Sequence, residues 1–357
     1  MRRVTVNKIA SIAQRLALRK QVVLGPDIPA QTGTVVVGRV LTSKTTYNKL
    51  EDITGRMTEL RPGDLIVGAL GARHALHGYS GRVPERVQVG DRLQLLNIGG
   101  VLGVGASPAP GLGAPHEVEV LGCVQQFHGL DRGVGRPANI ADAALEKLPL
   151  PAQLPPVLTL LGTSMDAGKT TAAAVIVGGL TRRGLRVAGG KLTGVSLRRD
   201  ILQMADAGAD PVSLFTDFGV VTSSPENAPP TARAILAHLA ESEPDLIVLE
   251  MGDGLLGTYG VQAILDAPDL RAATTAIVLC AQDPVGAWGA QQLLADRHEA
   301  RASLVSGPVT DNPVGREFCE KQLGLPAYNA LLAPAELVDG CLDALELPRG
   351  AVAVPSP

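Results

Sequence analysis

The hydrophobic positions in the first half of the chain come in short runs that predict β-strands. Between residues 21 and 125, these runs are separated by Gly, Pro and Asp at close intervals. Three of them lie at residues 33–37, 64–67 and 92–96. Because short strands joined by frequent turns are typical of compact all-β folds, we expect a β-rich barrel or sandwich over residues 1–128.

The first twenty residues have a helical pattern instead. Apolar residues recur there at i, i+3, i+4 and i+7, which is the spacing of one helix face; they are Ile9, Ile12, Ala13 and Leu16. The segment contains no acidic residue and so superficially resembles an organelle presequence. We favour an amphipathic N-terminal helix that packs on the first domain.

The second half of the chain has the alternating pattern of an α/β domain. Glycine and proline gather between residues 129 and 156 and predict a linker, with a short helix at residues 141–148. Beyond it, strand-like apolar runs alternate with helical stretches, at residues 157–161, 185–188, 245–249, 275–279 and 303–305. Because fully apolar strands separated by helices must be covered on both faces, we expect a mostly parallel sheet in residues 157–357.

The composition describes a globular protein without a strong charge bias. The 357 residues are 45% hydrophobic and 19% charged, which permits packed cores and predicts two domains. A net charge of −3 and an aromatic content of 3% favour neither nucleic acid nor an anionic membrane as a partner. No apolar run reaches the roughly 20 residues of a membrane helix, and the four scattered cysteines form no C-x-x-C pair. We therefore expect a cytoplasmic protein and leave a homodimer open.

The strongest chemical signal follows the first strand of the second half. That strand runs into a loop that ends in Gly-Lys-Thr, where an alanine-rich helix begins; the loop and the first helical residues are Gly162, Thr163, Ser164, Met165, Asp166, Ala167, Gly168, Lys169, Thr170 and Thr171. In a P-loop, backbone N–H groups hold the phosphates, the lysine reaches the β- and γ-phosphate oxygens, and the hydroxyl residue binds Mg²⁺. We therefore predict that Lys169 contacts phosphate and Thr170 contacts the metal. A Gly-Lys-Thr that begins a helix by chance is the alternative.

The position of the first glycine in this loop carries a resemblance. The usual G-x-x-x-x-G-K-[ST] spacing would place glycine at Thr163, whereas here it stands one residue earlier, at Gly162. The loop therefore resembles the G-T-x-x-x-x-G-K-T loop of dethiobiotin synthetase and its relatives in the SIMIBI class of P-loop proteins. It is also similar to the loop of the P-loop family that includes D-glutamate N-acetyltransferases. The resemblance covers residues 157–330, and the first half resembles no family. Ser164 stands where switch ATPases of the MinD and ParA type have an extra lysine, which argues against a dimeric switch.

The second strand of this half ends in residues that we expect at the same site. Ligands bind at the carboxyl ends of parallel strands in such sheets, so Lys191, Thr193 and Gly194 are candidate substrate residues. In dethiobiotin synthetase-like enzymes, a lysine after this strand lies at the substrate and the phosphates. Lys191 resembles that lysine, which implies a catalytic role; a solvated lysine at a strand end is the alternative.

Three carboxylates are candidates for the metal and its surroundings. Glu250 directly follows the strand-like run at residues 245–249, and a carboxylate there can hold Mg²⁺ directly or through water. In the resembled family, a glutamate before a glycine-rich turn has this role, so Glu250 is the first metal candidate. Asp253 in the turn is the second, and also a candidate substrate residue. The relatives supply a further Mg²⁺-linked aspartate from the region of Asp200, which we take as a metal candidate. An acid that caps a helix or lies on a helix face is the alternative for each.

Two further motifs bear on the nucleotide and on other metals. Asn48 and Lys49 do not form the guanine-reading N-K-x-D motif, because Glu51 replaces the aspartate and the segment lies in the first domain. ATP is therefore the default nucleotide, and Asn312 lies in the region where the relatives read the base. His74 and His77 have an i, i+3 spacing that could face one metal, but no acidic or cysteine partner is visible nearby, so we favour ordinary loop or barrel-rim histidines.

These residues predict a Mg²⁺- and ATP-dependent enzyme that acts on a small molecule. We expect a kinase or ligase that transfers the γ-phosphate to a carboxylate or similar group of a metabolite, because such chemistry needs positioning and charge neutralisation more than a covalent nucleophile. The resemblance leaves open an N-acyltransferase that holds the phosphates of coenzyme A at the P-loop. A nucleotide-gated chaperone or scaffold is the alternative from another functional class.

Overall fold

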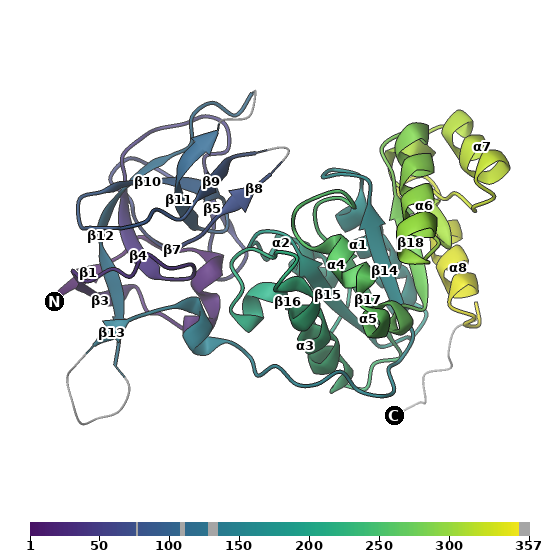
Figure 1. Ribbon diagram of the computed structural model, residues 1–357, viewed down its shortest axis with the longest axis horizontal. Helices are drawn as coiled ribbons and strands as arrows, with labels where there is room; N and C mark the ends of the chain where they lie inside the picture. Colours follow the sequence, from purple (N-terminus) through teal and green to yellow (C-terminus); the bar gives the residue numbers. More distant parts are fainter. Residues whose placement is uncertain (76–77, 108–110, 128–134, 350–357) are drawn as a thin grey trace. The chain divides into compact units, whose positions relative to one another are not determined.

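The computed structural model describes residues 1–75, 78–107, 111–127 and 135–349 (Figure 1). The chain divides into two compact units, which we call the β unit and the α/β unit. The β unit comprises Met1–Leu145, Val195–Arg199 and Thr216–Thr222, and the α/β unit comprises Glu146–Gly194, Asp200–Phe215 and the chain from Ser223 onward. His77 and residues 129–134 of the predicted linker lie outside the described residues.

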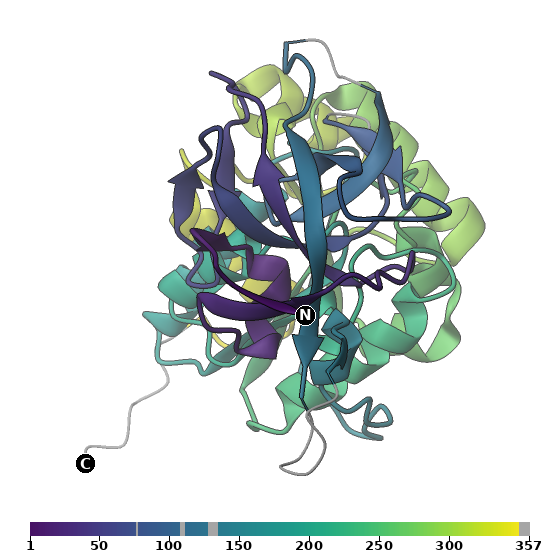
Figure 2. The ribbon, with the colours of Figure 1, turned by 90° about the vertical axis from the view of Figure 1, so that its left-hand side faces the viewer.

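The strands of the β unit form a closed barrel (Figures 1 and 2). Its ring of hydrogen-bonded neighbours runs through β4 (Val35–Val40), β7 (Leu65–Leu70), β11 (Val101–Ser107), β10 (Arg92–Asn97) and β12 (Glu117–Gln126), which returns to β4. Six shorter strands extend the sheet at this ring: β1 (Arg2–Thr5), β2 (Lys8–Ile9), β3 (Gln21–Gly25), β8 (Arg73–His74), β9 (Ser80–Arg82) and β13 (Arg136–Pro137). A separate hairpin pairs β5 (Lys49–Glu51) with β6 (Met57–Glu59). Of the two β-rich folds expected from the sequence, a barrel or a sandwich, the structure therefore has the barrel.

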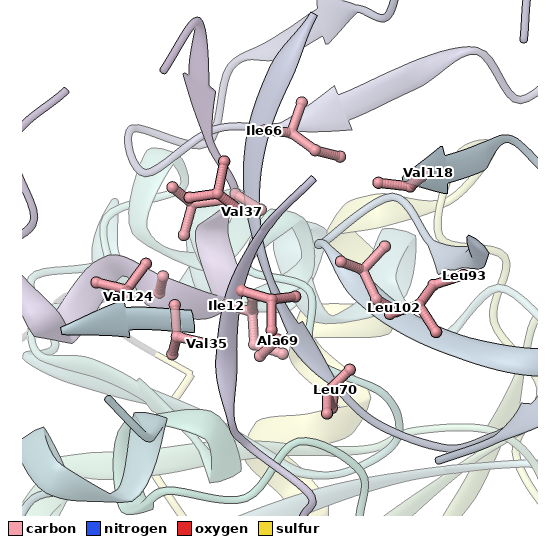
Figure 3. Close-up of a cluster of buried hydrophobic side chains, with 14 of the residues drawn as sticks. Ile12, Val35, Val37, Ile66, Ala69, Leu70, Leu93, Leu102, Val118 and Val124 are labelled. Carbon is pink, nitrogen blue, oxygen red and sulfur yellow. The ribbon is translucent and has the colours of Figure 1, made fainter. Parts of the chain in front are cut away.

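Branched aliphatic side chains fill the barrel. Figure 3 shows part of this core, with Val35 and Val37 from β4, Ile66 and Leu70 from β7, and Leu102 from β11 among its buried members. Val and Ile suit such a core because their branched side chains pack well on a pleated sheet. Closure also leaves the five ring strands without an unpaired edge.

The predicted N-terminal helix is wrong in extent and type. Residues 2–5 form β1, which pairs antiparallel with β3, and a 3₁₀-helix (η1, Ser11–Leu16) replaces the expected α-helix. Ile9, Ile12 and Ala13 are buried all the same. The apolar residues thus reach the core from a short strand and a 3₁₀ turn, because pairing with the sheet satisfies the backbone that a helix would have satisfied locally.

The predicted linker is also wrong in part. β13 pairs with β12, and a second 3₁₀-helix (η2, Ile140–Ala143) takes the place of the helix expected at residues 141–148. Asn139 caps η2 and Asp142 bonds back to the Asn139 N–H, which completes a capping box. These pairings place the division between the units after Leu145 rather than at residue 128.

Two later segments of the chain belong to the β unit, and a buried carboxylate holds one of them. Glu51 is fully buried, and its carboxylate accepts hydrogen bonds from the Ser11 hydroxyl and from the Arg198 N–H, the latter at 2.8 Å. The Arg198 guanidinium also pairs with Asp217 at 3.0 Å. Glu51 is thus a polar centre of the β unit and no part of a guanine-reading motif.

Glu51→Ala should lower the free energy of unfolding by about 2–4 kcal/mol, because each buried donor left without a partner costs about 1–3 kcal/mol. Chemical denaturation followed by circular dichroism measures the change. Glu59→Ala, at an exposed position on β6, is the matched control. Equal stability of the two variants would show that Glu51 contributes nothing of this size.

The α/β unit is built on a six-stranded parallel sheet in the order β16-β15-β17-β14-β18-β19. Its strands are β14 (Val157–Gly162), β15 (Val187–Thr193), β16 (Val212–Leu214), β17 (Leu246–Met251), β18 (Ala276–Cys280) and β19 (Leu304–Ser306). Five of them were predicted, although β15 lies further along the chain than residues 185–188. β16 was missed because its three residues form no distinct apolar run.

Helices cover both faces of this sheet (Figure 1). They are α1 (Lys169–Thr181), α2 (Arg199–Asp206), α3 (Ala228–Ala240), α4 (Val261–Asp266), α5 (Pro268–Ala273), α6 (Pro284–His298), α7 (Pro313–Gln322) and α8 (Pro334–Ala344), with 3₁₀ turns η3 (Phe215–Phe218) and η4 (Pro308–Thr310). α1 and α8 share a core cluster with Leu158 and Leu160, while α3 packs at Gly190 on the other face. Among the described residues, no helix has the length and apolarity needed to span a membrane.

Candidate nucleotide-binding site

The loop between β14 and α1 is shaped by two left-handed residues and by close neighbours. Asp166 has a φ of 61° and Gly168 a φ of 88°, directly before the helix begins. A Cβ at Gly168 would lie 3.2 Å from Gly307 Cα, and a Cβ at Gly254 would lie 2.8 Å from Ser164 Cα. The loop after β17, through Gly254, and the loop after β19, through Gly307, therefore both contact the loop between β14 and α1. The N–H groups of the first helical turn have no intrahelical acceptor, which suits them to bind an anion.

Lys169 supplies a buried positive charge inside this loop. Lys169 is only 6% exposed. Its Nζ donates to the Ser164 carbonyl oxygen at 2.8 Å and to the Asp253 carbonyl oxygen at 2.5 Å. Burial lowers the pKa of Lys169, while the charge of Glu250 acts in the opposite direction. Both hydrogen-bond acceptors are neutral, so the charge remains available for a phosphate oxygen.

Thr170 and Glu250 meet at the edge of the sheet, as predicted for a metal site. The Thr170 hydroxyl donates to Glu250 Oε1 at 3.1 Å. Glu250 is 2% exposed, and its Oε2 has no hydrogen-bond partner among the described residues. Burial raises the pKa of Glu250, and the nearby charge of Asp200 raises it further. A buried carboxylate oxygen without a partner is costly unless it meets a cation. These two side chains therefore fit Mg²⁺.

The remaining ligands of such a metal would have to come from phosphate and water. The described residues contain no group of three or more His, Cys, Asp or Glu side chains that could hold a metal ion. Mg²⁺ typically keeps several waters and takes few protein ligands when it binds with a nucleotide. The donor set of one hydroxyl and one carboxylate is thus sufficient for a nucleotide-bound ion.

Lys191 lies at the end of β15, as predicted, but it already has a carboxylate partner. Its ammonium group pairs with Asp200 Oδ2, and both residues are buried. The positive charge of Lys191 also lowers the pKa of Lys169, so the two lysines lie within electrostatic range. Asp200 also lies within electrostatic range of Glu250, since its charge raises the pKa of that carboxylate, and its own carboxylate is bound to Lys191. The counter-ion role and the metal role remain alternatives for Asp200.

The other predicted site residues have mainly structural contacts. The fully buried Thr193 donates its hydroxyl to the Gly252 carbonyl at 2.9 Å, and the Gly194 N–H donates to the Ser223 hydroxyl at 2.7 Å. The exposed Asn312 accepts from the Gly315 N–H at 3.1 Å and so caps α7. Asp253 is buried with a φ of 67°, and its carbonyl holds Lys169. Of these four residues, Asp253 is the one that bonds directly to Lys169 in the part of the chain that the structure describes.

Gln282, which no sequence pattern singled out, bonds to the loop between β14 and α1. Its side-chain amide donates to the Asp166 carbonyl at 2.9 Å, and its N–H donates to the Thr163 hydroxyl at 3.3 Å. The signal that could have found Gln282 is its place two residues after the end of β18 at Cys280, because β18 is a neighbour of β14 in the sheet. The same region holds Trp288, the only tryptophan of the chain, on α6 and 54% exposed. Because a Cβ at Gly286 would lie 3.4 Å from Thr163, the start of α6 borders the loop, and Trp288 is a natural fluorescence reporter.

Comparison with known proteins yields only distant structural similarity. No protein-family model and no curated protein matches the chain. The signal recognition particle receptor FtsY from Elizabethkingia anophelis is 14% identical, with a TM-score of 0.35 over 56% of this chain and 70% of that chain. A DUF1611 family protein from Anabaena variabilis is 14% identical, with a TM-score of 0.39 over 55% of this chain and 62% of that chain.

A third solved structure is the signal recognition particle 54 kDa protein from Aeropyrum pernix in complex with GDP. It is 18% identical, with a TM-score of 0.33 over 58% of this chain and 52% of that chain. The chain thus spans less than two thirds of this protein and of the DUF1611 family protein. Similarity this weak decides nothing about activity, so the assignment of the site rests on its own residues.

Proposed function

We propose that the chain is a Mg²⁺-dependent enzyme that uses ATP to phosphorylate or activate a small metabolite, in the manner of a kinase or ligase. The observation that carries the proposal is the arrangement of Lys169, Thr170 and Glu250 at the end of β14 and β17. A phosphate-directed cation, a metal-binding hydroxyl and a buried carboxylate with a free oxygen are the parts that phosphoryl transfer requires.

Each part of the site has a distinct task in this proposal. Lys169 and the N–H groups of the first turn of α1 bind phosphate oxygens and hold them in a fixed position. Thr170 and Glu250 hold Mg²⁺, and the bound ion would neutralise negative charge on the phosphates. Lys191, whose ammonium group is oriented by Asp200, provides a second cation at the same carboxyl-terminal edge of the sheet. That cation suits an acceptor group that is itself an anion, such as a carboxylate.

ATP with Mg²⁺ should stabilise the protein against heat. A ligand that binds only the folded state adds about 2.7 kcal/mol at a hundredfold excess over its Kd. Thermal melting with ATP and Mg²⁺, with GTP and Mg²⁺, and with ATP in EDTA measures the effect. We expect the largest rise in Tm for ATP with Mg²⁺ and a smaller one for each of the other two. No rise with ATP at any Mg²⁺ concentration would refute the proposal.

The same assay separates the proposed enzyme from an acyltransferase. A Tm that rises with coenzyme A and not with ATP would favour a P-loop that holds the phosphates of coenzyme A. Release of ADP in proportion to an added metabolite would support phosphoryl transfer, because neither an acyltransferase nor a nucleotide-gated scaffold consumes ATP in this way.

A further inference from the structure

A second candidate site lies entirely within the β unit. A cavity of about 320 Å³ opens between residues 42–46 and residues 112–115. This volume falls at the small end of ligand pockets, which typically span about 300–1,000 Å³. Its lining has one charged side chain, that of Lys44, and no acidic residue. The cavity therefore carries a net positive charge.

Among the residues that the structure describes, the hydrogen-bond partners of Lys44 are all neutral oxygens. Nζ donates to the Tyr79 hydroxyl at 3.0 Å and to the Leu112 carbonyl at 2.8 Å, and it also donates to the Ala114 carbonyl. It lies 5.6 Å from the centre of the Tyr79 ring. These contacts fix the ammonium group in place, yet none of them neutralises it. In a partly buried site, an unneutralised cation favours the arrival of an anion.

Hydroxyl groups beside Lys44 could complete an anion site. Ser43, Thr45 and Thr46 line the cavity, and neither their hydroxyls nor their backbone N–H groups make a hydrogen bond to any residue that the structure describes. Thr42 differs, because its hydroxyl accepts from the Glu117 N–H at 3.1 Å. The cavity thus offers one cation and several unused donors from a single loop.

The neighbouring histidine adds no charge to this site. His116 Nδ1 lies 3.1 Å from the Thr42 carbonyl oxygen, which holds the proton on that nitrogen. Burial lowers the pKa of His116, and the charge of Lys44 lowers it as well. The hydrogen bond to the Thr42 carbonyl raises the pKa of His116 in part, against the larger effect of burial. Among the described residues that line the cavity, Lys44 is the one with a positively charged side chain. Leu112 and Pro115 form an apolar wall opposite the hydroxyl-rich loop.

We propose that this cavity binds a small oxyanion, a carboxylate or phosphate group attached to a short apolar body. Lys44 and the unused donors of residues 43–46 hold the oxyanion, and the wall formed by Leu112 and Pro115 holds the body. The proposal is independent of the phosphate-binding loop in the α/β unit. The competing explanation is that Lys44 has a structural role only and holds the segment of Leu112 and Ala114 in place through their carbonyl oxygens. In that case, added anions leave hydrogen exchange at the cavity unchanged.

Hydrogen–deuterium exchange at millisecond to second times tests the proposal on the full chain. The probes are inorganic phosphate and butyrate, each compared with chloride at equal ionic strength. If the cavity binds a probe, exchange in the peptide of residues 41–47 slows by the factor 1 + [L]/Kd, or about tenfold at nine times Kd. The peptide of residues 162–171 reports phosphate binding at the P-loop separately. Slowing with phosphate alone or with butyrate alone identifies the oxyanion.

Three variants complete the test. Lys44→Met removes the charge, and the double change Thr45→Val with Thr46→Val removes two hydroxyls that have no structural contact. Lys49→Met, at an exposed lysine of β5, is the control. Support requires that slowing in the wild type and in Lys49→Met is lost in both lining variants. If Lys44→Met does not fold, the double variant alone decides. Unchanged exchange with both probes, or slowing that persists in the lining variants, would overturn the proposal.

Discussion

Lys169→Ala should weaken ATP binding by about 100-fold and lower any ATP-dependent turnover by at least about 10²–10³-fold. A hydrogen bond to a charged group contributes about 1.5–3 kcal/mol, and removal of a donor that stabilises transition-state charge typically has an effect of this size on turnover. The variant should lose function rather than stability because the Lys169 ammonium group bonds to two carbonyl oxygens, and the hydrophobic clusters of the described residues do not include Lys169. Quenching or enhancement of Trp288 fluorescence during an ATP titration measures the affinity.

Two controls make this result specific. Lys321→Ala removes an exposed lysine of α7 and should leave ATP binding unchanged. Lys169→Arg keeps the charge but should fail as well, because Nζ lies against the Gly162 backbone, so close that a Cβ built on Gly162 would be 2.6 Å away, and a larger guanidinium group would collide there. Wild-type ATP affinity in Lys169→Ala would remove the P-loop from the proposed function. A collapsed melting transition would instead assign Lys169 a structural role.

The part of the site that could be predicted is the part that is local in sequence. The strand, the loop and the start of the helix lie within residues 157–171, so the pattern alone located Lys169 and Thr170. Glu250 is 80 residues from Thr170, yet it was found because the carboxyl ends of parallel strands meet at one edge of the sheet. β17 proved to be the direct neighbour of β14, which brings the two side chains within hydrogen-bonding distance.

The contacts that escaped prediction depend on which elements become neighbours. The pairing of Lys191 with Asp200 joins the last part of a strand to the first turn of α2; both residues were expected at the site, but no local pattern indicates that they bind each other. Gln282 reaches Asp166 only because β18 lies beside β14. In each case the residue type was visible, but its partner was set by the order of strands in the sheet.

The β unit illustrates the same limit at the level of a domain. Short apolar runs predicted strands, but closure of the barrel requires β10 to pair with both β11 and β12, which no local pattern encodes. The inclusion of Val195–Arg199 depends on a hydrogen bond to Glu51 from a residue 147 positions away. The prediction of an N-terminal helix was wrong for a related reason: residues 2–5 pair with β3, and this tertiary pairing overrides a local pattern that also suits a helix.

Glu250→Gln should raise the apparent Mg²⁺ midpoint at saturating ATP by at least about tenfold, equivalent to about 1.4 kcal/mol. Glutamine preserves the shape of the side chain and can still accept from the Thr170 hydroxyl, but it removes the charge that a hard cation prefers. Turnover should fall together with the metal affinity. Titration of Mg²⁺, followed by Trp288 fluorescence or by ADP release, gives the midpoint, with Glu243→Gln as an exposed control that also loses one carboxylate.

The stability of the same variant separates a metal ligand from a structural acid. Burial raises the pKa of Glu250, and its Oε2 has no hydrogen-bond partner among the described residues, so the ionised carboxylate destabilises the metal-free protein. Glu250→Gln should therefore leave the free energy of unfolding in EDTA unchanged or slightly higher. If the main role of Glu250 is instead to pair with Lys169 or Lys191, the substitution should lower the free energy of unfolding, because it leaves a buried positive charge without its partner. A lower stability combined with an unchanged Mg²⁺ midpoint would assign Glu250 to the second role, whereas a raised midpoint at undiminished stability requires that its carboxylate acts on the metal.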